Sequence, residues 1–202
     1  MLYIAMHYAW ASKLTGDYFE FGVYKGSNMI AAFHISKRYL PNLNFYAFDS
    51  FEGLPEPKED KDGFRPFEKG QFSCSKEHFL ANLKRKEVDM SRVHTIAGWY
   101  KDTLNEQTRA SLPAKSAAIV YIDCDLYESA LSVLDFIVPY LEDGSLILFD
   151  EWFAYRGDPA KGEQKAFREW LGGGRNPQIS ATEYQKFGWS GNSFIIHVRN
   201  KS

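Results

Sequence analysis

The stretch Glu20-Phe21-Gly22-Val23-Tyr24-Lys25-Gly26-Ser27 decides the expected fold of this chain. It joins Tyr18–Val23, an apolar run typical of a strand, to Ser27–Tyr39, where apolar residues recur at helical spacing. Gly22 permits a tight turn, and we expect Gly26 to let the backbone come close to a ligand. The third glycine of a dinucleotide fingerprint is missing, so an ordinary strand–helix turn is the alternative interpretation.

Strands and helices alternate along the rest of the chain. Further strands are predicted over Asn44–Phe48, Val93–Ala97, Ala117–Ile122, Ser145–Phe149, Ile179–Lys186 and Phe194–Val198. Further helices are predicted over residues 1–16, Ser75–Lys86, Asp102–Ser111, Ser129–Leu141 and Gly162–Leu171. Glycines predict turns at Gly144 and at Gly188–Gly191, the second of which closes a hairpin. The alternation predicts one α/β domain (1–202) with a doubly wound, Rossmann-like sheet and an antiparallel strand at its edge.

One long irregular stretch, residues 52–72, interrupts this alternation. It is charged, contains three prolines and has no helical or strand periodicity. Loops of this length are uncommon in compact domains and are often active-site lids, so we predict a lid here. A surface insertion without a function is the alternative.

Composition excludes several classes of partner. The 202 residues include 24 Lys and Arg and 26 Asp and Glu, so the net charge of −2 gives no reason to expect a nucleic acid or an anionic membrane. No apolar run approaches the roughly 20 residues that span a bilayer, and the apolar start lacks the basic region of a signal peptide. Cys74 and Cys124 form no metal or redox motif, and reduced thiols suit a cytoplasmic protein.

Acidic residues follow three of the predicted strands. Asp49 ends the second strand, where a carboxylate can accept hydrogen bonds from a ribose diol, unless it caps the turn at Ser50–Gly53. The pairs Asp123/Asp125 and Asp150/Glu151 follow two apolar strands that we expect to be neighbours. Burying these four carboxylates without a counterion would be costly, and Mg²⁺ would resolve the cost. Salt bridges to Lys25, Lys101 or Arg156 are the alternative.

The remaining candidates are weaker. Trp99 follows the third strand and is expected either to pack on a nucleobase or to lie in the core. His78 follows the predicted lid and is a candidate for approaching a substrate. The other histidines show no metal-ligand spacing, and no nucleophile motif is present.

Four ordered blocks together resemble the macrocin O-methyltransferase (TylF/MycF-like) family of class I S-adenosylmethionine-dependent methyltransferases. The resemblance covers most of the chain, from about residue 17 to residue 198. Its blocks are Glu20–Gly26, Phe48–Pro55 (FDSFEGLP), Gly98–Leu104 (GWYKDTL) and Asp123–Ser129 (DCDLYES). The Asp150-Glu151-Trp152 segment stands where the family has an acidic pair.

The resemblance implies a seven-stranded class I methyltransferase fold, a homodimer, Mg²⁺ and a small-molecule hydroxyl acceptor, often a natural-product sugar. It implies that Glu20–Gly26 holds the amino-acid end of S-adenosylmethionine, Asp49 the ribose, and Gly98 with Trp99 the adenine. The full set of expected cofactor contacts is Glu20, Gly22, Tyr24, Gly26, Ser27, Asp49, Ser50, Gly98, Trp99 and Asp123. The implied metal ligands are Asp123, Asp150 and Glu151, the last standing where Asp or Asn is expected.

We therefore expect a Mg²⁺-assisted SN2 O-methylation, in which the acceptor oxygen lies in line with the S–CH₃ bond. The metal would lower the pKa of the acceptor hydroxyl. The expected catalytic residues are Asp123 and a base chosen from Asp125, Lys101 and His78, among which the sequence does not decide. Two other functions stay open: a metal-dependent nucleotide-sugar glycosyltransferase that uses Asp123-Cys124-Asp125 as a DxD motif, and a non-catalytic cofactor-binding module.

Overall fold

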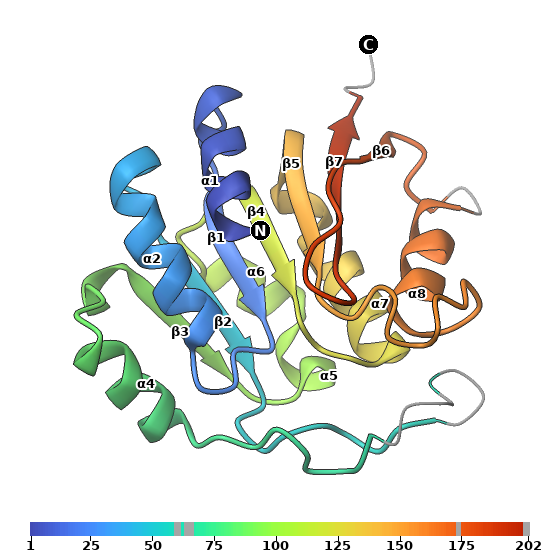
Figure 1. Ribbon diagram of the computed structural model, residues 1–202, viewed down its shortest axis with the longest axis horizontal. Coiled ribbons are helices and arrows are strands. Elements are labelled where there is room, and N and C mark those ends of the chain that lie inside the picture. Colours follow the sequence, from blue (N-terminus) through green and yellow to red (C-terminus); the bar gives the residue numbers. More distant parts are fainter. Residues whose placement is uncertain (59–61, 63–66, 173–174, 200–202) are drawn as a thin grey trace.

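A central sheet of seven strands organises the computed structural model, which describes residues 1–58, 62, 67–172 and 175–199 (Figure 1). The strands follow the order β3-β2-β1-β4-β5-β7-β6. Their bounds are β1 (Asp17–Phe21), β2 (Phe45–Asp49), β3 (Val93–Ala97), β4 (Ala117–Ile122), β5 (Leu141–Phe149), β6 (Ile179–Glu183) and β7 (Asn192–Val198). The first five are parallel, whereas β7 runs antiparallel between β5 and β6. The predicted doubly wound sheet with antiparallel pairing at one edge is confirmed.

Helices cover both faces of the sheet and complete a three-layer fold (Figure 1). The α-helices are α1 (Leu2–Ala11), α2 (Ser27–Tyr39), α4 (Lys76–Arg85), α5 (Tyr100–Thr103), α6 (Glu106–Ser111), α7 (Tyr127–Ile137) and α8 (Gly162–Leu171). Two 3₁₀ turns, η1 (Met90–Arg92) and η2 (Val138–Tyr140), precede β3 and β5. The apolar sides of α1, α2 and α4 pack on one face of the sheet, and those of α7 and α8 pack on the other.

Aromatic residues of the two central strands supply much of the core. Phe19 and Phe21 of β1 face the α7 side with Tyr46 and Phe48 of β2, and the Phe21 and Phe48 rings stack with centroids 4.4 Å apart. All six residues of β4 are buried, as expected for a strand covered on both faces.

The predicted helix over Asp102–Ser111 is wrong as a single element. The chain forms α5 and α6 instead, because Asn105 breaks the first helix and caps the second, accepting a hydrogen bond from the Thr108 amide at 2.9 Å. Sequence periodicity missed this because an Asn that caps a helix reads like any polar residue on its surface.

The boundary between α7 and β5 also differs from prediction. The predicted helix over Ser129–Leu141 begins two residues earlier and gives way to η2 at Val138, next to Pro139. Gly144, predicted as a turn, lies inside β5 with φ of +96°, where the β4–β5 register shifts. A glycine with positive φ at a register shift is typical of a bulge.

The predicted hairpin at Gly188–Gly191 is confirmed, with the Phe187 and Gly191 amides and carbonyls paired at 3.0 and 2.9 Å. The strand predicted over Ile179–Lys186 ends at Glu183, and its partner begins at Asn192. This hairpin lies at the same edge of the sheet as the carboxyl ends of the parallel strands, because β7 runs antiparallel to β5.

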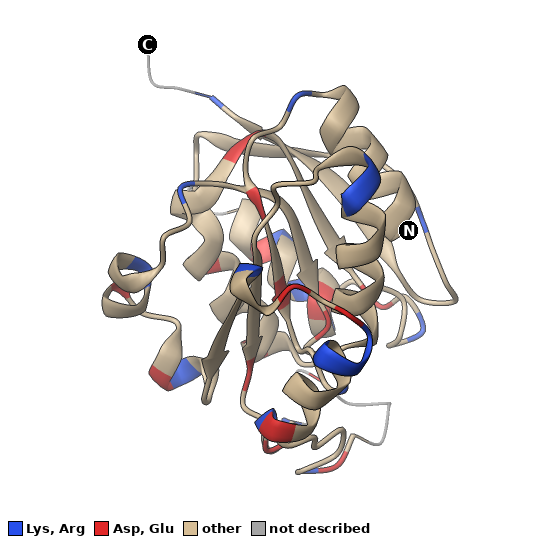
Figure 2. Ribbon diagram, turned by 90° about the vertical axis from the view of Figure 1, so that its left-hand side faces the viewer, with Lys and Arg blue, Asp and Glu red and all other residues tan. Residues whose placement is uncertain are grey.

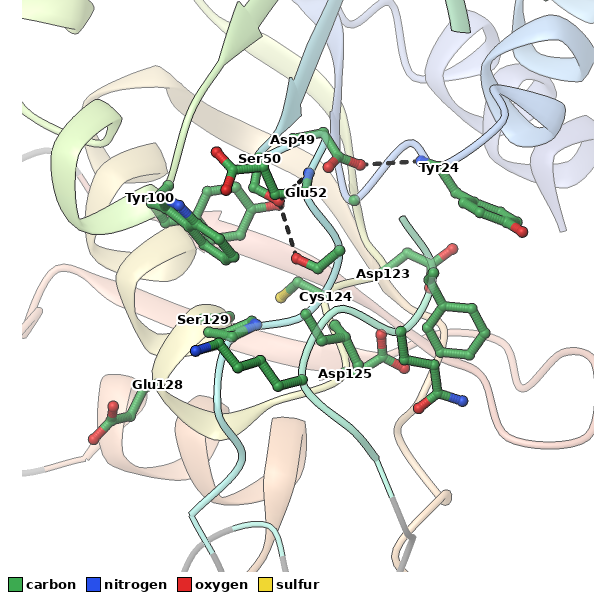
Figure 3. A pocket seen from close by; sticks show the side chains of 18 of the residues that line it. Tyr24, Asp49, Ser50, Glu52, Tyr100, Asp123, Cys124, Asp125, Glu128 and Ser129 are labelled. Carbon is green, nitrogen blue, oxygen red and sulfur yellow. Dashed lines mark hydrogen bonds between the residues drawn. The ribbon is translucent and has the colours of Figure 1, made fainter. Parts of the chain in front are cut away.

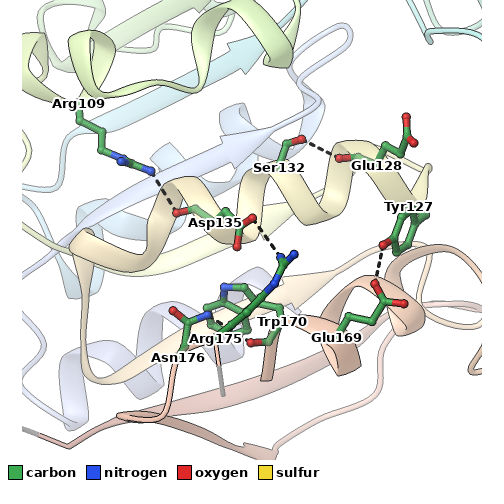
Figure 4. Close-up of polar contacts among 9 residues, drawn as sticks. All are labelled: Arg109, Tyr127, Glu128, Ser132, Asp135, Glu169, Trp170, Arg175 and Asn176. Atoms are coloured by element: carbon green, nitrogen blue, oxygen red, sulfur yellow. Dashed lines mark hydrogen bonds and ion pairs between the residues drawn. The ribbon is translucent and has the colours of Figure 1, made fainter. Parts of the chain in front are cut away.

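Hydrogen bonds and an ion pair hold α7 in place on its side of the sheet (Figure 4). The Arg109 guanidinium donates to the Asp135 carbonyl at 3.1 Å, and Arg175 pairs with the Asp135 carboxylate at 3.4 Å. At the other end of the helix, the Tyr127 hydroxyl donates to Glu169 of α8. The hydrogen bond from Tyr127 to α8 thus holds the N-terminal turn of α7 in place beside the strand ends.

The segment predicted as a lid crosses below the carboxyl ends of the strands (Figure 1). Its two arms pair through the Leu54 amide to Gln71 O and the Gly70 amide to Leu54 O, both at 2.9 Å. Lys58 forms a 2.7 Å ion pair with Glu128 of α7. Residues 59–61 and 63–66 of this predicted lid lie outside the described residues, as do two of the glycines after α8.

Basic and acidic residues are interspersed along the ribbon, with no face that is basic alone in the view of Figure 2. Among the described residues, no helix is both long and apolar enough to cross a lipid bilayer.

Candidate functional site

Four strand ends meet at one edge of the sheet and are fixed by backbone hydrogen bonds. The residue after each strand donates its amide to the neighbouring strand: Gly98 to Asp49 O, Gly22 to Phe48 O, Asp123 to Phe21 O and Asp150 to Ile122 O, at 2.9 to 3.0 Å. These bonds continue the parallel ladders beyond the last paired residues. The predicted meeting of the acidic strand ends at one edge is therefore confirmed.

A cavity of about 900 Å³ opens at this edge (Figure 3). Its walls are the strand ends, residues 49–56 and 69–72, and the first turn of α7. It contains many of the predicted site residues: Gly22, Tyr24, Asp49, Ser50, Trp99, Lys101, Asp123, Asp125, Asp150 and Glu151. A cavity of this size has room for a nucleoside-sized ligand and a second small molecule.

Other predicted site residues do not line the cavity: Glu20, Gly26, Ser27, Gly98 and His78. A Cβ at Gly26 would lie 2.6 Å from Leu83 Cδ1 and 3.0 Å from Phe79, so packing against α4 accounts for this glycine. The expectation that Gly26 lets the backbone come close to a ligand stays a prediction. His78 is exposed in the first turn of α4, where its amide donates to Ser75 Oγ.

Gly22 serves a close approach between two strands. A Cβ there would lie 1.8 Å from the carbonyl oxygen of Asp123, and its φ is +87°. Only glycine allows β1 and β4 to continue side by side into the cavity wall at this point. The turn that follows carries Tyr24, exposed at the cavity and itself at φ +45°.

The Asp49 carboxylate is held by backbone amides (Figure 3). Its Oδ2 accepts from the Val23 and Tyr24 amides at 2.8 and 3.0 Å, and its Oδ1 accepts from the Phe51 amide at 2.8 Å. Asp49 therefore ties the loop after β1 to the loop after β2. Asp49 therefore also caps the turn at Ser50–Gly53, as the alternative interpretation expected.

Asp123 lies in an environment that disfavours its charge. Burial raises the pKa of Asp123 well above its usual range, and the nearby carboxylates of Asp150, Asp125, Glu20 and Glu151 raise it further. The side-chain amide of Asn28 donates to its Oδ2 at 3.4 Å. A carboxyl group in these surroundings holds its proton more tightly than an exposed aspartate does.

Asp150 and Glu151 extend the acidic wall on the β5 side. The Tyr121 hydroxyl donates to Asp150 Oδ1 at 2.6 Å, and the Glu151 amide donates to Glu163 Oε2 at 3.1 Å. Lys25 and Lys101, proposed above as salt-bridge partners, pair with no acid among the described residues.

Glu20 lies beneath the cavity floor on β1. It is 1% exposed and accepts a hydrogen bond from the Tyr18 hydroxyl at 2.8 Å. Burial, together with smaller contributions from Asp49 and Asp150, raises the pKa of Glu20 to about 8, although the hydrogen bond from Tyr18 lowers it. At neutral pH this carboxyl group is mostly protonated.

The sequence reasoning missed several residues that shape the site. Tyr100 lines the cavity, and its hydroxyl donates to Phe48 O at 3.3 Å. Ser129 and Ser132 of α7 also line it, and their i, i+3 spacing was a usable signal because it places both on one side of the helix. Glu163, fully buried in the first turn of α8, gave no signal because acidic residues are common at helix starts.

The donor chemistry of this edge suits a hard cation, because Asp123 and Asp150 bring carboxylate oxygens to the same cavity. Repulsion from Asp150 is the largest charge effect on the pKa of Asp123, and a cation would relieve it. The described residues nevertheless contain no group of three His, Cys, Asp or Glu side chains arranged around one point. The predicted convergence of Asp123, Asp150 and Glu151 on one ion is thus not preformed.

Comparison with known proteins gives a consistent picture. A family model described as macrocin-O-methyltransferase (TylF) matches residues 2–170. The chain is 29% identical over 148 residues to the 8-demethyl-8-(2,3-dimethoxy-alpha-L-rhamnosyl)-tetracenomycin-C 4'-O-methyltransferase of Streptomyces olivaceus, covering 70% of this chain. It spans only about half of that relative's length, 55%.

Solved structures share the fold. The O-methyltransferase NovP superposes with a TM-score of 0.77 at 21% identity, over 99% of this chain and 78% of NovP. The calicheamicin methyltransferase CalS11 superposes with a TM-score of 0.75 at 25% identity, over 96% of this chain and 77% of CalS11. The seven-stranded sheet described above is therefore the sheet of known O-methyltransferases.

Proposed function

The chain belongs to the macrocin-O-methyltransferase (TylF) family, and from this premise we propose that it is an S-adenosylmethionine-dependent O-methyltransferase. The proposed acceptor is a hydroxyl group of a small molecule such as a natural-product sugar, and Mg²⁺ is the proposed metal. The observation that carries the proposal is the cavity at the carboxyl ends of β1, β2, β4 and β5, which brings a glycine turn, aromatic side chains and carboxylates together.

The cofactor fits the half of the cavity between β1 and β3. In this proposal Trp99 and Tyr100 border the adenine, and the turn containing Gly22 and Tyr24 borders the amino-acid end. Aromatic faces suit a nucleobase. Glu20 supports the turn from below and does not reach the cavity itself.

The acceptor fits the half of the cavity bounded by Asp123, Asp125 and Asp150. Methyl transfer needs the acceptor oxygen held in line with the sulfonium–methyl bond, and most of the rate gain comes from that positioning. Asp123 is suited to accept the hydroxyl proton at a carboxylate oxygen, because burial raises its pKa. Asp125 and Lys101 line the cavity and are further candidates for the base, whereas His78 lies outside it.

Mg²⁺ would be held by Asp123 and Asp150, with Glu151 as the third proposed ligand. When bound, it would lower the pKa of the acceptor hydroxyl and hold that hydroxyl in place. The support for this proposal is the clustering of carboxylates that raises the pKa of Asp123. The family resemblance supports a homodimer, and the free thiols of Cys74 and Cys124 support a cytoplasmic location, so we include both in the proposal.

Isothermal titration with S-adenosylhomocysteine tests the proposed function, with and without Mg²⁺. We expect saturable binding near one site per chain. A panel of rhamnosides and other glycosides, followed by detection of S-adenosylhomocysteine as product, then tests for acceptors.

Titration with a nucleoside diphosphate sugar and Mn²⁺ separates this proposal from the glycosyltransferase alternative. Heat with the nucleotide sugar and none with S-adenosylhomocysteine would contradict the methyltransferase. Cofactor binding with no turnover of any acceptor would favour the non-catalytic module.

A further inference from the structure

Two aromatic rings, those of Tyr24 and Phe72, meet in the wall of the cavity. Both residues line it, and their rings lie edge to face with centroids 6.0 Å apart. Tyr24 is 38% exposed and Phe72 is 43% exposed. The Lys25 ammonium lies over the Tyr24 ring, 4.8 Å from its centroid. Phe72 therefore has the more open ring of the two.

Phe72 has an arrangement that folding by itself does not favour. Its φ of +59° lies in the left-handed region, where a bulky side chain is a genuine outlier. Its ring is left partly in water, although an aromatic side chain stabilises a protein most when it is buried. Backbone outliers of this kind collect at ligand-binding sites. Both features indicate that Phe72 serves a ligand.

Phe51 shows what packing does with the same backbone conformation. Its φ is also +59°, but its ring packs on Phe79 of α4 with centroids 5.6 Å apart, and it does not line the cavity. Packing therefore accounts for Phe51. Among the described residues, the Phe72 ring has one aromatic contact, the Tyr24 ring, so packing does not account for Phe72 in the same way.

The backbone on both sides of Phe72 is held by hydrogen bonds. Before it, the Gln71 carbonyl accepts from the Leu54 amide at 2.9 Å. After it, Ser75 caps α4 by accepting from the His78 amide at 3.2 Å. The Phe72 ring is thus preorganised, and a ligand that packs on it loses little free energy in ordering the protein.

The two rings lie on the side of the cavity that holds the acceptor in the proposed function. Figure 3 shows Tyr24 on the same side as Asp123, with Tyr100 across the cavity. A sugar ring carries hydroxyl groups at its rim and C–H groups on its faces. Such a ring can therefore present a hydroxyl to Asp123 while one of its faces covers an aromatic side chain.

We propose that Phe72 binds the C–H face of the acceptor's sugar ring, an inference that rests on the proposed function. Tyr24 is then a positioning residue, whose ring supports that of Phe72. An axial hydroxyl on the bound face would lose its hydrogen bonds to water against an apolar ring, and that loss is costly. Phe72 thus selects acceptors by the face that they present.

Saturation-transfer difference NMR tests this assignment on protein loaded with S-adenosylhomocysteine and Mg²⁺. The probes are methyl β-D-glucoside and methyl α-L-rhamnoside, and the protein is irradiated at its aromatic protons. For at least one probe we expect strong transfer to C–H protons on one face of the ring. Phe72→Ala should weaken binding of that probe by about tenfold, because less apolar surface is buried. Its affinity for S-adenosylhomocysteine, measured by titration, should stay at the wild-type value.

Two further variants control for the ring and for general loss of aromatic surface. Phe72→Tyr should bind the probe as the wild type does, because it keeps the ring. Tyr184→Ala should also bind it normally, because Tyr184 is 37% exposed but does not line the cavity.

The assignment is overturned if Phe72→Ala binds the probe as the wild type does. It is also overturned if Tyr184→Ala weakens the probe equally, or if Phe72→Ala weakens S-adenosylhomocysteine as much as the probe. A wild type that binds S-adenosylhomocysteine but neither glycoside overturns the assignment and leaves the methyltransferase proposal standing. No binding of S-adenosylhomocysteine to the wild type overturns both.

Discussion

Asp49 and Asp123 are the same residue type at equivalent places, yet their surroundings differ completely. Asp49 is the last residue of β2 and Asp123 directly follows β4, and each lines the cavity at the carboxyl edge of the sheet. Three backbone amides donate to Asp49, all within 3.0 Å. Asp123 receives one side-chain amide at 3.4 Å and is surrounded by other carboxylates.

The difference shows that the donors around a carboxylate, more than its position in the fold, decide what it can do. Amides that saturate Asp49 make it a brace between two loops, because a satisfied carboxylate gains little from a new partner. Burial among acids leaves Asp123 in need of a proton or a cation. The β2 end of the cavity thus holds a carboxylate fixed by amides, whereas the β4 end holds one whose charge is disfavoured by its surroundings.

Asp123→Asn should have the largest effect. We expect Mg²⁺ affinity, measured by titration of the protein loaded with S-adenosylhomocysteine, to fall by about 100-fold, because a ligand is lost. The melting temperature should stay the same or rise, because the substitution removes a carboxylate whose charge is disfavoured by burial and by Asp150. If Asp123→Asn lowered the melting temperature, Asp123 would stabilise the fold as Asp49 does, and the contrast between the two residues would not hold.

Asp125→Asn is the matched control for that experiment. It changes an acid two residues away in the same cavity wall that is not among the proposed metal ligands. Equal losses of Mg²⁺ affinity in both variants would mean that the general charge of the wall binds the ion, and that Asp123 has no specific role.

Glu20→Gln should have the next largest effect. The surroundings of Glu20 are intermediate between those of Asp49 and those of Asp123. It lies on β1, between the strands that carry Asp49 and Asp123, and its pKa is raised from 4.5 to about 8 by burial and then by Asp49 and Asp150. The folded state therefore keeps a proton that the unfolded chain releases above pH 4.5. Its contribution to stability is complete below that pH and is lost as the pH rises through 8.

Glu20→Gln should remove this pH dependence, since glutamine stays neutral and can still accept from the Tyr18 hydroxyl. Between pH 5 and pH 9 the variant should gain on the order of 4 kcal/mol relative to the wild type, from the size of the pKa shift. Urea denaturation at several pH values measures it. A constant difference across that range would show that Glu20 ionises normally in the folded protein.

Asp49→Asn should have the smallest effect of the three, a loss of stability. An asparagine side chain has one acceptor oxygen, so at least one of the three loop amides loses its partner. We expect a loss of about 2 kcal/mol in the free energy of unfolding. Glu52→Gln serves as the control, because its side chain bonds no described residue and its loss should leave stability unchanged. If Asp49→Asn were as stable as the wild type, the loops after β1 and β2 would not depend on the hydrogen bonds to Asp49.

Much of the fold was predictable because local signals and burial agree. The predicted bounds of Ser27–Tyr39, Val93–Ala97, Ala117–Ile122 and Gly162–Leu171 coincide with those of α2, β3, β4 and α8. In each of these segments, apolar residues recur with the period of the element that forms, and residues that end such an element follow. The predictions failed at Asp102–Ser111 and Gly144, where a cap and a bulge depend on hydrogen bonds that periodicity does not report.

The sequence alone determined that acids would follow the strands and that these strands would end at one edge, because alternation of apolar runs with helices predicts a parallel sheet. Only the tertiary structure decided which of those acids are satisfied. Hydrogen bonds from the loop after β1 reach Asp49 across 25 and 26 positions of sequence. Of the carboxylates around Asp123, Asp125 lies in the same loop, whereas Glu20 comes from β1 and Asp150 and Glu151 come from the segment after β5. Charge is a property of the residue, but whether a charge is paired is a property of the fold.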